Sequence, residues 1–250
     1  LEVRKDHWSE GGAQVAAEQG LQASSFARAA KAYTNAVGSY ISRSSARRIT
    51  EGFGERLVHQ KKQEAERATE VAKVGESPQD RRVRLQDPIQ GWGNISSDGT
   101  MLLARGEGWK EVKAAVFSKV EVLEPEDGKR RSGQREGKRA HEDIVRLSAH
   151  SYCAGLWDAD TFGPHQYAEG LRRGLDQVEH LSSVNDGAPW IERTTLTNFP
   201  DARQVIDWNH AVERLWAVAH AVYGEGGAAK EWVEPHEEAL WVGRVEQEIE

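Results

Sequence analysis

The order of expected strands and helices after residue 91 limits the fold of this chain more than any other feature. Three strand-like runs come first, and Val112, Ala114 and Val116 show the period-2 alternation typical of a strand. Helices and strands then alternate, and the last helix carries an apolar stripe at helical spacing. The expected elements are strands over 94–98, 100–125 and 143–155, a helix over 158–177, a strand over 178–186, a helix over 188–196, a strand over 202–207 and a helix over 208–224.

This order predicts a mixed α/β fold, because three antiparallel strands are followed by two strand–helix crossovers that add parallel strands. It is the order of a ribonuclease-H-like core. In that architecture the first and fourth strands are neighbours. Asp98 and Asp186 stand at the expected ends of these two strands, so we expect them to lie side by side although 88 residues separate them.

A glycine follows each of these two aspartates, which raises two interpretations. Asp-Gly pairs are common in turns, so two unrelated turns would explain them. Alternatively, Asp98 and Asp186 hold one divalent cation, since Mg²⁺ prefers oxygen ligands and often takes one or two carboxylates. On that hypothesis Gly99 and Gly187 keep side-chain bulk away from an approaching DNA backbone.

Three longer stretches carry a resemblance to a known family. They are SSDGTMLLARGEGWKEVKAAVFSKVE (96–121), NDGAPWI (185–191) and FPDARQVIDWNHAVERLWAVAHAVYGEG (199–226). Together they resemble bacterial insertion-sequence transposases of the ISKra type, and the similarity runs from about residue 92 to 241. Those enzymes are DDE-type transposases, which carry an Asp-Asp-Glu metal triad on a ribonuclease-H-like core.

The resemblance implies that Asp98 and Asp186 are the first two catalytic carboxylates and that they bind Mg²⁺ or Mn²⁺. Asp207 and His210 match an Asp-x-x-His element, which implies a structural or DNA-handling role or, alternatively, metal ligation. Asp207 is also a natural helix N-cap. The family's third acid, in a Gly-Ser-Gly-x-x-Glu context, is not found among the 250 residues, so we expect a chain cut short before it.

The expected function is therefore that of a DNA transposase, or a fragment of one, cleaving phosphodiesters and transferring strands. The expected partner is double-stranded DNA with terminal repeats, bound by a homo-oligomer, with no nucleotide cofactor and no membrane, in the bacterial cytoplasm. One alternative is a catalytically inactive DNA-binding remnant that inhibits or regulates transposition. Another is a globular interaction protein, which the acidic last 50 residues favour, since they hold 11 acidic and 4 basic side chains.

The remaining expectations concern domains and DNA contacts. Residues 1–85 are expected to be a helical, DNA-binding region, 86–223 the catalytic core and 224–250 the start of a helical insertion or tail. Ser42 or Ser44 would cap a helix in the first region. Two basic clusters are candidate phosphate contacts, or simply solvated segments. The first cluster contains Arg43, Arg47 and Arg48, and the second contains Arg130 and Arg131.

Trp109, Lys110 and Lys113 belong to the second expected strand. We expect Trp109 to be packed and the two lysines to be exposed, or else all three to contact the substrate.

Overall fold

A computed structural model describes residues 8–74, 83, 85–104, 106–123 and 144–244. The chain divides into two compact units, Leu1–Glu66 and Arg67–Glu250. The expected boundary near residue 85 falls in a segment of which only a few residues are described, and residues 124–143 lie outside the described residues.

The first unit is helical, as the alanine-rich sequence predicts. It contains α1 (Glu10–Gln22), α2 (Phe26–Val37) and the start of α3 (Arg43–Val74). Ser42 caps α3, because its Oγ accepts a hydrogen bond of 3.0 Å from the backbone N–H of Ser45. The small core of this unit consists of Ala13, Ala16, Ala17, Ala30, Tyr33, Ile41, Ala46 and Ile49.

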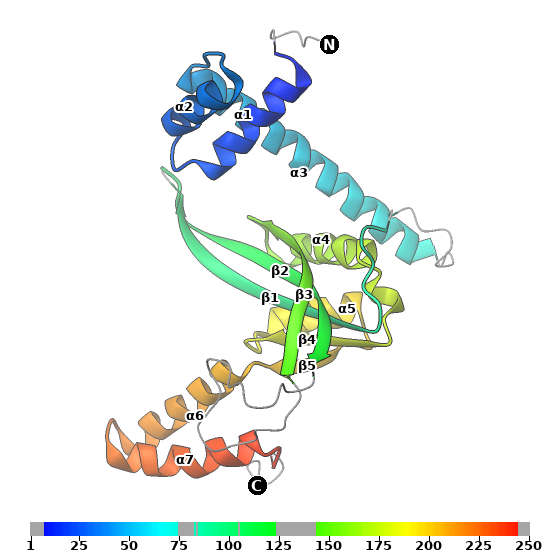
Figure 1. Ribbon diagram of the computed structural model, residues 1–250. Helices are drawn as coiled ribbons and strands as arrows, with labels where there is room; N and C mark the ends of the chain where they lie inside the picture. The colour runs from blue at the N-terminus through cyan, green and yellow to red at the C-terminus, as the bar shows by residue number, and fades with distance from the viewer. Residues whose placement is uncertain (1–7, 75–82, 84, 105, 124–143, 245–250) are drawn as a thin grey trace. The chain divides into compact units, whose positions relative to one another are not determined.

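The second unit is built on a five-stranded mixed sheet in the order β3-β2-β1-β4-β5 (Figure 1). The β1–β2 and β2–β3 pairs are antiparallel, while β1–β4 and β4–β5 are parallel. The expected mixed α/β class, the order of elements and the neighbouring first and fourth strands are therefore confirmed. The strands are β1 (Trp92–Ala104), β2 (Gly108–Leu123), β3 (Ile144–Gly155), β4 (His180–Asn185) and β5 (Arg203–Ile206).

Helices α4 (Ala159–Arg172) and α5 (Pro189–Asn198) pack against each other, and α4 packs on β2 and β3. Asp158 starts α4 as an N-cap, since its Oδ1 accepts a 2.8 Å hydrogen bond from the Thr161 N–H. Pro189 at the first position of α5 fits the fixed φ of proline. The core between this layer and the sheet contains Ile89, Ile95, Ala115, Phe117, Phe162, Leu175, Phe199 and Ala202.

The two faces of β1 are distinct, and this decides where the candidate site lies. Ile95 is fully buried, and Ser97 Oγ accepts a 3.1 Å hydrogen bond from Gln166 Nε2 of α4. Successive side chains of a strand point to opposite faces. Asn94, Ser96 and Asp98 therefore belong to the face turned away from α4.

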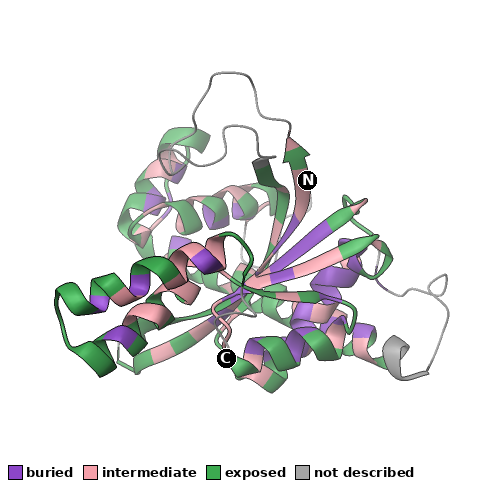
Figure 2. Cartoon of the chain, turned by 90° about the horizontal axis from the view of Figure 1, so that it is seen from below, coloured by how far each residue is buried: buried purple, intermediate pink, exposed green. Residues whose placement is uncertain are grey.

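Helices α6 (Trp208–Tyr223) and α7 (Gly227–Trp241) pack on each other around a separate small core of Ala219, Ala229 and Val233. Most residues of these two helices are exposed, as Figure 2 shows. Val222, expected in the apolar stripe of α6, is 66% exposed. Among the helices of the described residues, none combines the length and apolar character needed to cross a bilayer.

Replacing Gly170 by alanine tests the close packing of α4 on α5. A Cβ at Gly170 would collide with the buried ring of Phe199, so we expect Gly170→Ala to lower the free energy of unfolding by about 1–3 kcal/mol. Gly163→Ala in the same helix is the matched control, because its Cβ would meet only a Thr194 methyl at 3.5 Å. The control should be neutral or stabilising by about 0.5–1 kcal/mol. Urea denaturation measures both, and equal effects would contradict the packing argument.

Candidate metal and nucleic-acid site

Asp98 lies within a strand, so the expectation that it ends one is wrong. Strand β1 continues to Ala104, and Asp98 is paired with Ala114 of the neighbouring strand β2. Its side chain is exposed, and Oδ1 accepts a 2.7 Å hydrogen bond from the N–H of Gly99. The strand continues because its hydrogen bonds to β2 outweigh the turn preference of the Asp-Gly pair.

Asp186 follows the last residue of β4 directly and begins a turn, as expected. Its Oδ1 accepts a 2.8 Å hydrogen bond from the Ala188 N–H. Arg214 of α6 donates a 2.8 Å hydrogen bond to the main-chain oxygen of Asp186. Gly187 has a φ of +76°, which favours glycine, and a Cβ there would lie 3.1 Å from Arg214 Nη2.

The register of β1 and β4 relates the two aspartates. The last parallel pair is Ile95 with Ser183. Asp98 and Asp186 each stand three residues beyond this pair, and no further β1–β4 pair forms among the described residues. Asp186 lies one residue beyond the end of β4, whereas Asp98 lies in the part of β1 that is paired with β2 alone.

Asp207 adds a third carboxylate to this edge. Its backbone N–H donates a 2.9 Å hydrogen bond to the Asn185 oxygen, which continues the β4–β5 pairing by one residue. Asp207 is also the N-cap of α6, and its Oδ1 accepts a 3.2 Å hydrogen bond from the His210 N–H. The capping role expected from the sequence is therefore confirmed. His210 turns back and its Nδ1 is hydrogen-bonded to Asp207 Oδ2.

The charges around His210 shift two pKa values. The hydrogen bond that His210 Nδ1 donates to the Asp207 carboxylate raises the pKa of His210, desolvation opposes this, and the charges of Asp207, Glu213 and Asp186 add to the increase. Desolvation acts to raise the pKa of Asp207, but the hydrogen bonds from the side chain and backbone of His210 outweigh it, so the net shift is downward. The Asp186 carboxylate therefore contributes to the raised pKa of His210.

Two expectations about the neighbouring residues are corrected. Gly99 does not make room for DNA on the face of Asp98: a Cβ there would collide with the carboxylate of Glu111, on the face covered by α4. Trp109 is 64% exposed and not packed, whereas the side chain of Lys113 is only 6% exposed. Sequence reasoning thus missed a buried cation beside the strand that carries Asp98.

The first basic cluster is on the surface of the helical unit. Arg43, Arg47 and Arg48 lie in the first two turns of α3 and are exposed, and Arg47 Nε forms a 2.7 Å ion pair with Glu51. Arg130 and Arg131 lie outside the described residues. The structure therefore places one cluster of candidate phosphate contacts, on α3.

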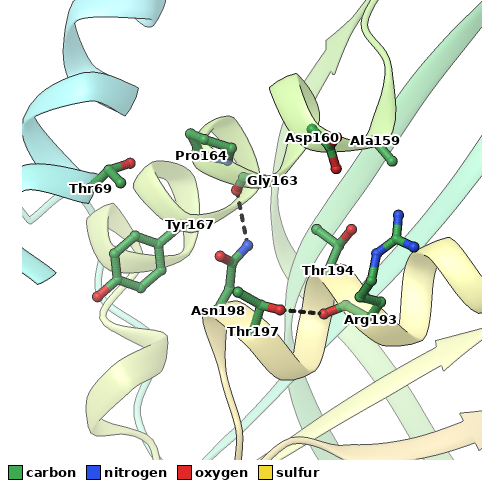
Figure 3. A pocket seen from close by; sticks show the side chains of 10 residues that line it. All are labelled: Thr69, Ala159, Asp160, Gly163, Pro164, Tyr167, Arg193, Thr194, Thr197 and Asn198. Atoms are coloured by element: carbon green, nitrogen blue, oxygen red, sulfur yellow. Dashed lines mark hydrogen bonds between the residues drawn. The ribbon is translucent and has the colours of Figure 1, made fainter. Parts of the chain in front are cut away.

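A pocket of about 520 Å³ lies among α3, α4 and α5 (Figure 3). Its polar groups are bonded within the protein: Thr197 Oγ1 donates to the Arg193 oxygen, and Asn198 Nδ2 donates to the Gly163 oxygen. Helix α4, which lines the pocket, packs on the face of the sheet opposite to Asp98. The pocket is therefore separate from the edge that carries the aspartates.

No group of three histidine, cysteine or acidic side chains suited to a metal ion occurs among the residues that the structure describes. Asp98 and Asp186 can at most contribute two carboxylates, with the remaining ligands supplied by water or phosphate, as is common for Mg²⁺. No known protein family matches the chain, and no curated protein is significantly similar to it.

The pH titration of His210 tests the geometry around Asp186. We expect its midpoint, followed by NMR of the imidazole protons, to lie above the usual value of about 6.5. Asp207→Asn should lower the midpoint most, because it removes the nearest charge and replaces a charged hydrogen-bond acceptor by a neutral one. Asp186→Asn should lower it by a smaller amount.

The same titration has a consequence for stability. A pKa raised on folding stabilises the protein below the unfolded pKa, and this contribution is lost as the pH rises through the folded pKa of His210. The lowered pKa of Asp207 acts in the opposite direction, so its contribution to stability is lost as the pH falls.

The titration can also contradict the geometry: a His210 midpoint that Asp186→Asn leaves unchanged would show that the two side chains are not close.

Proposed function

We propose that this protein is a metal-dependent DNA transposase, or a part of one, in which Asp98 and Asp186 hold Mg²⁺ or Mn²⁺. One observation supports the proposal: Asp98 and Asp186, far apart in sequence, each follow the last pair of two adjacent parallel strands by three residues, and Asp98 belongs to the face turned away from α4. The Asp98 side chain is exposed, whereas α4 packs on the opposite face of the sheet.

The strand order supports a ribonuclease-H-like core for this function. The order β3-β2-β1-β4-β5, with β1 central and parallel to β4, matches the arrangement that the resemblance to ISKra-type transposases implies. On such a core the carboxylates at the ends of neighbouring strands are the expected metal ligands. The resemblance, together with the positions of Asp98 and Asp186, makes DNA the proposed substrate.

The two aspartates are suited to a hard divalent cation. In each carboxylate Oδ1 accepts one backbone N–H, from Gly99 or Ala188, and Oδ2 makes no hydrogen bond within the described residues. One oxygen of each thus orients the group while the other is available to a ligand. A divalent cation bound there would activate the attacking oxygen and stabilise the leaving oxygen of the phosphodiester.

The other residues at this edge would handle the DNA backbone. The raised pKa of His210 favours its protonated form near Asp186, and Asp207 orients the ring through Nδ1. In the helical unit, Arg43, Arg47 and Arg48 of α3 would contact phosphates of the terminal repeats.

We propose a homo-oligomer on DNA, because joining two element ends to a target requires two copies of the site.

Removing either aspartate tests the proposal. With Mn²⁺ and duplex DNA from the flanks of this coding sequence, we expect Asp98→Ala and Asp186→Ala to lower strand cleavage by at least about 100-fold. Loss of a direct metal ligand should exceed the 10–100-fold effect typical of residues around the ligands. Asp201→Ala, an exposed turn residue, is the control and should keep full activity.

The outcomes separate the candidate functions. Cleavage by Asp98→Ala at the parental rate would overturn the proposed catalytic role. Salt-sensitive binding of the DNA without cleavage by the parent chain would instead favour the inactive DNA-binding protein.

A further inference from the structure

A buried lysine lies behind the strand that carries Asp98. Lys113 of β2 is 5% exposed, although lysine is almost never fully buried unless it is paired. Its cross-strand partners are Gly99 on β1 and Gly155 on β3, so neither neighbour places a side chain beside it. A Cβ at Gly99 would collide with Glu111, and one at Gly155 would collide with the ring of Trp157.

Two groups compensate the burial of the Lys113 ammonium. Its Nζ lies 2.8 Å from Glu111 Oε2, and the same atom lies 4.3 Å from the centre of the Trp190 ring. Cation–π contacts of this kind are strongest when the cation is shielded from water. The Lys113 charge also contributes to the lowered pKa of Asp158, after the larger effect of the hydrogen bonds from Thr161.

These contacts join the two segments that carry the aspartates. Trp190 stands four residues after Asp186, at the start of α5, and packs edge-on against Phe162. Glu111 lies over Gly99, the residue after Asp98. Lys113 is therefore linked to the Asp186 turn through Trp190 and to β1 through Glu111.

We propose that Lys113 is a positioning residue that fixes the Asp186 turn relative to Asp98, acting from the covered face of the sheet. Its effect on metal binding rests on the proposed function. Because Lys113 lies on the face opposite Asp98, it does not reach a ligand at the aspartates itself. It acts through the Trp190 ring on the Asp186 turn. Two hydrogen bonds of 2.8 Å shape this turn: the Gly187 N–H donates to Asn185 Oδ1, and the Ala188 N–H donates to Asp186 Oδ1.

Amide hydrogen exchange of Gly187 and Ala188 tests this role directly and without a metal. Lys113→Met keeps an unbranched side chain, one heavy atom shorter, but removes the charge, so we expect exchange at these two amides to rise about tenfold. Lys113→Arg keeps a cation that stacks on aromatic rings, and it should leave both exchange rates close to those of the parent. Amides of α7 are the internal control and should not change.

A second arm measures Mn²⁺ binding by the full chain, followed by electron paramagnetic resonance. We expect Lys113→Met to weaken Mn²⁺ binding about tenfold and Lys113→Arg to restore it. If Asp98→Ala binds Mn²⁺ as tightly as the parent, the proposed function fails, and the exchange at Gly187 and Ala188 alone decides the role of Lys113.

The proposal is overturned if Lys113→Met leaves the exchange of Gly187 and Ala188 unchanged. It is also overturned if Asp98→Ala weakens Mn²⁺ binding while Lys113→Met does not. Should Lys113→Met fail to fold, Trp190→Phe carries the test, because the smaller ring weakens the cation–π contact; it should raise the same two exchange rates about threefold. An unchanged rate in Trp190→Phe would equally contradict the proposal.

Discussion

The candidate site depends on the short parallel pairing of β1 with β4. Only four residue pairs form it, from Trp92 with His180 to Ile95 with Ser183. Polar groups fix its register: Ser182 Oγ donates a 2.8 Å hydrogen bond to the buried Asn94 Oδ1. A slip of one residue would leave these groups unpaired and would turn the β4 side chains to the opposite face, so the buried polar contacts specify the register of β4 on β1.

The order of elements and the adjacency of β1 and β4 could be predicted from the sequence, because both follow from periodicity and general rules of connection. The continuation of β1 through Asp98 and Gly99 could not. Asp-Gly is a local turn signal, whereas the strand is held by its pairing to Lys113, Val112 and the residues beyond them. The neighbour of Gly99 is equally non-local, since the Glu111 carboxylate of the partner strand lies over it.

Lys113 shows a second limit of sequence reasoning. Alternation in β2 draws attention to Val112, Ala114 and Val116, yet the buried face carries Lys113, Ala115 and Phe117. The one signal for this face was Phe117, the largest apolar side chain of the strand. A lysine in phase with it is expected at the surface unless its neighbours are known, and the glycines and the tryptophan that surround it come from β1, β3 and α5.

The Asp186 turn is held from two sides by residues that have no chemical role of their own. On one side Trp190 rests against Lys113, and on the other Arg214 of α6 donates to the Asp186 oxygen. Asp207 connects α6 to β4, because its side chain caps α6 and its backbone N–H donates to the Asn185 oxygen at the end of β4. A turn of three residues has no core to fix its shape, so the position of the Asp186 carboxylate depends on these contacts. The capping function of Asp207 is therefore compatible with a role at the proposed site, because the cap starts the helix that carries His210 and Arg214, and Arg214 contacts the Asp186 oxygen.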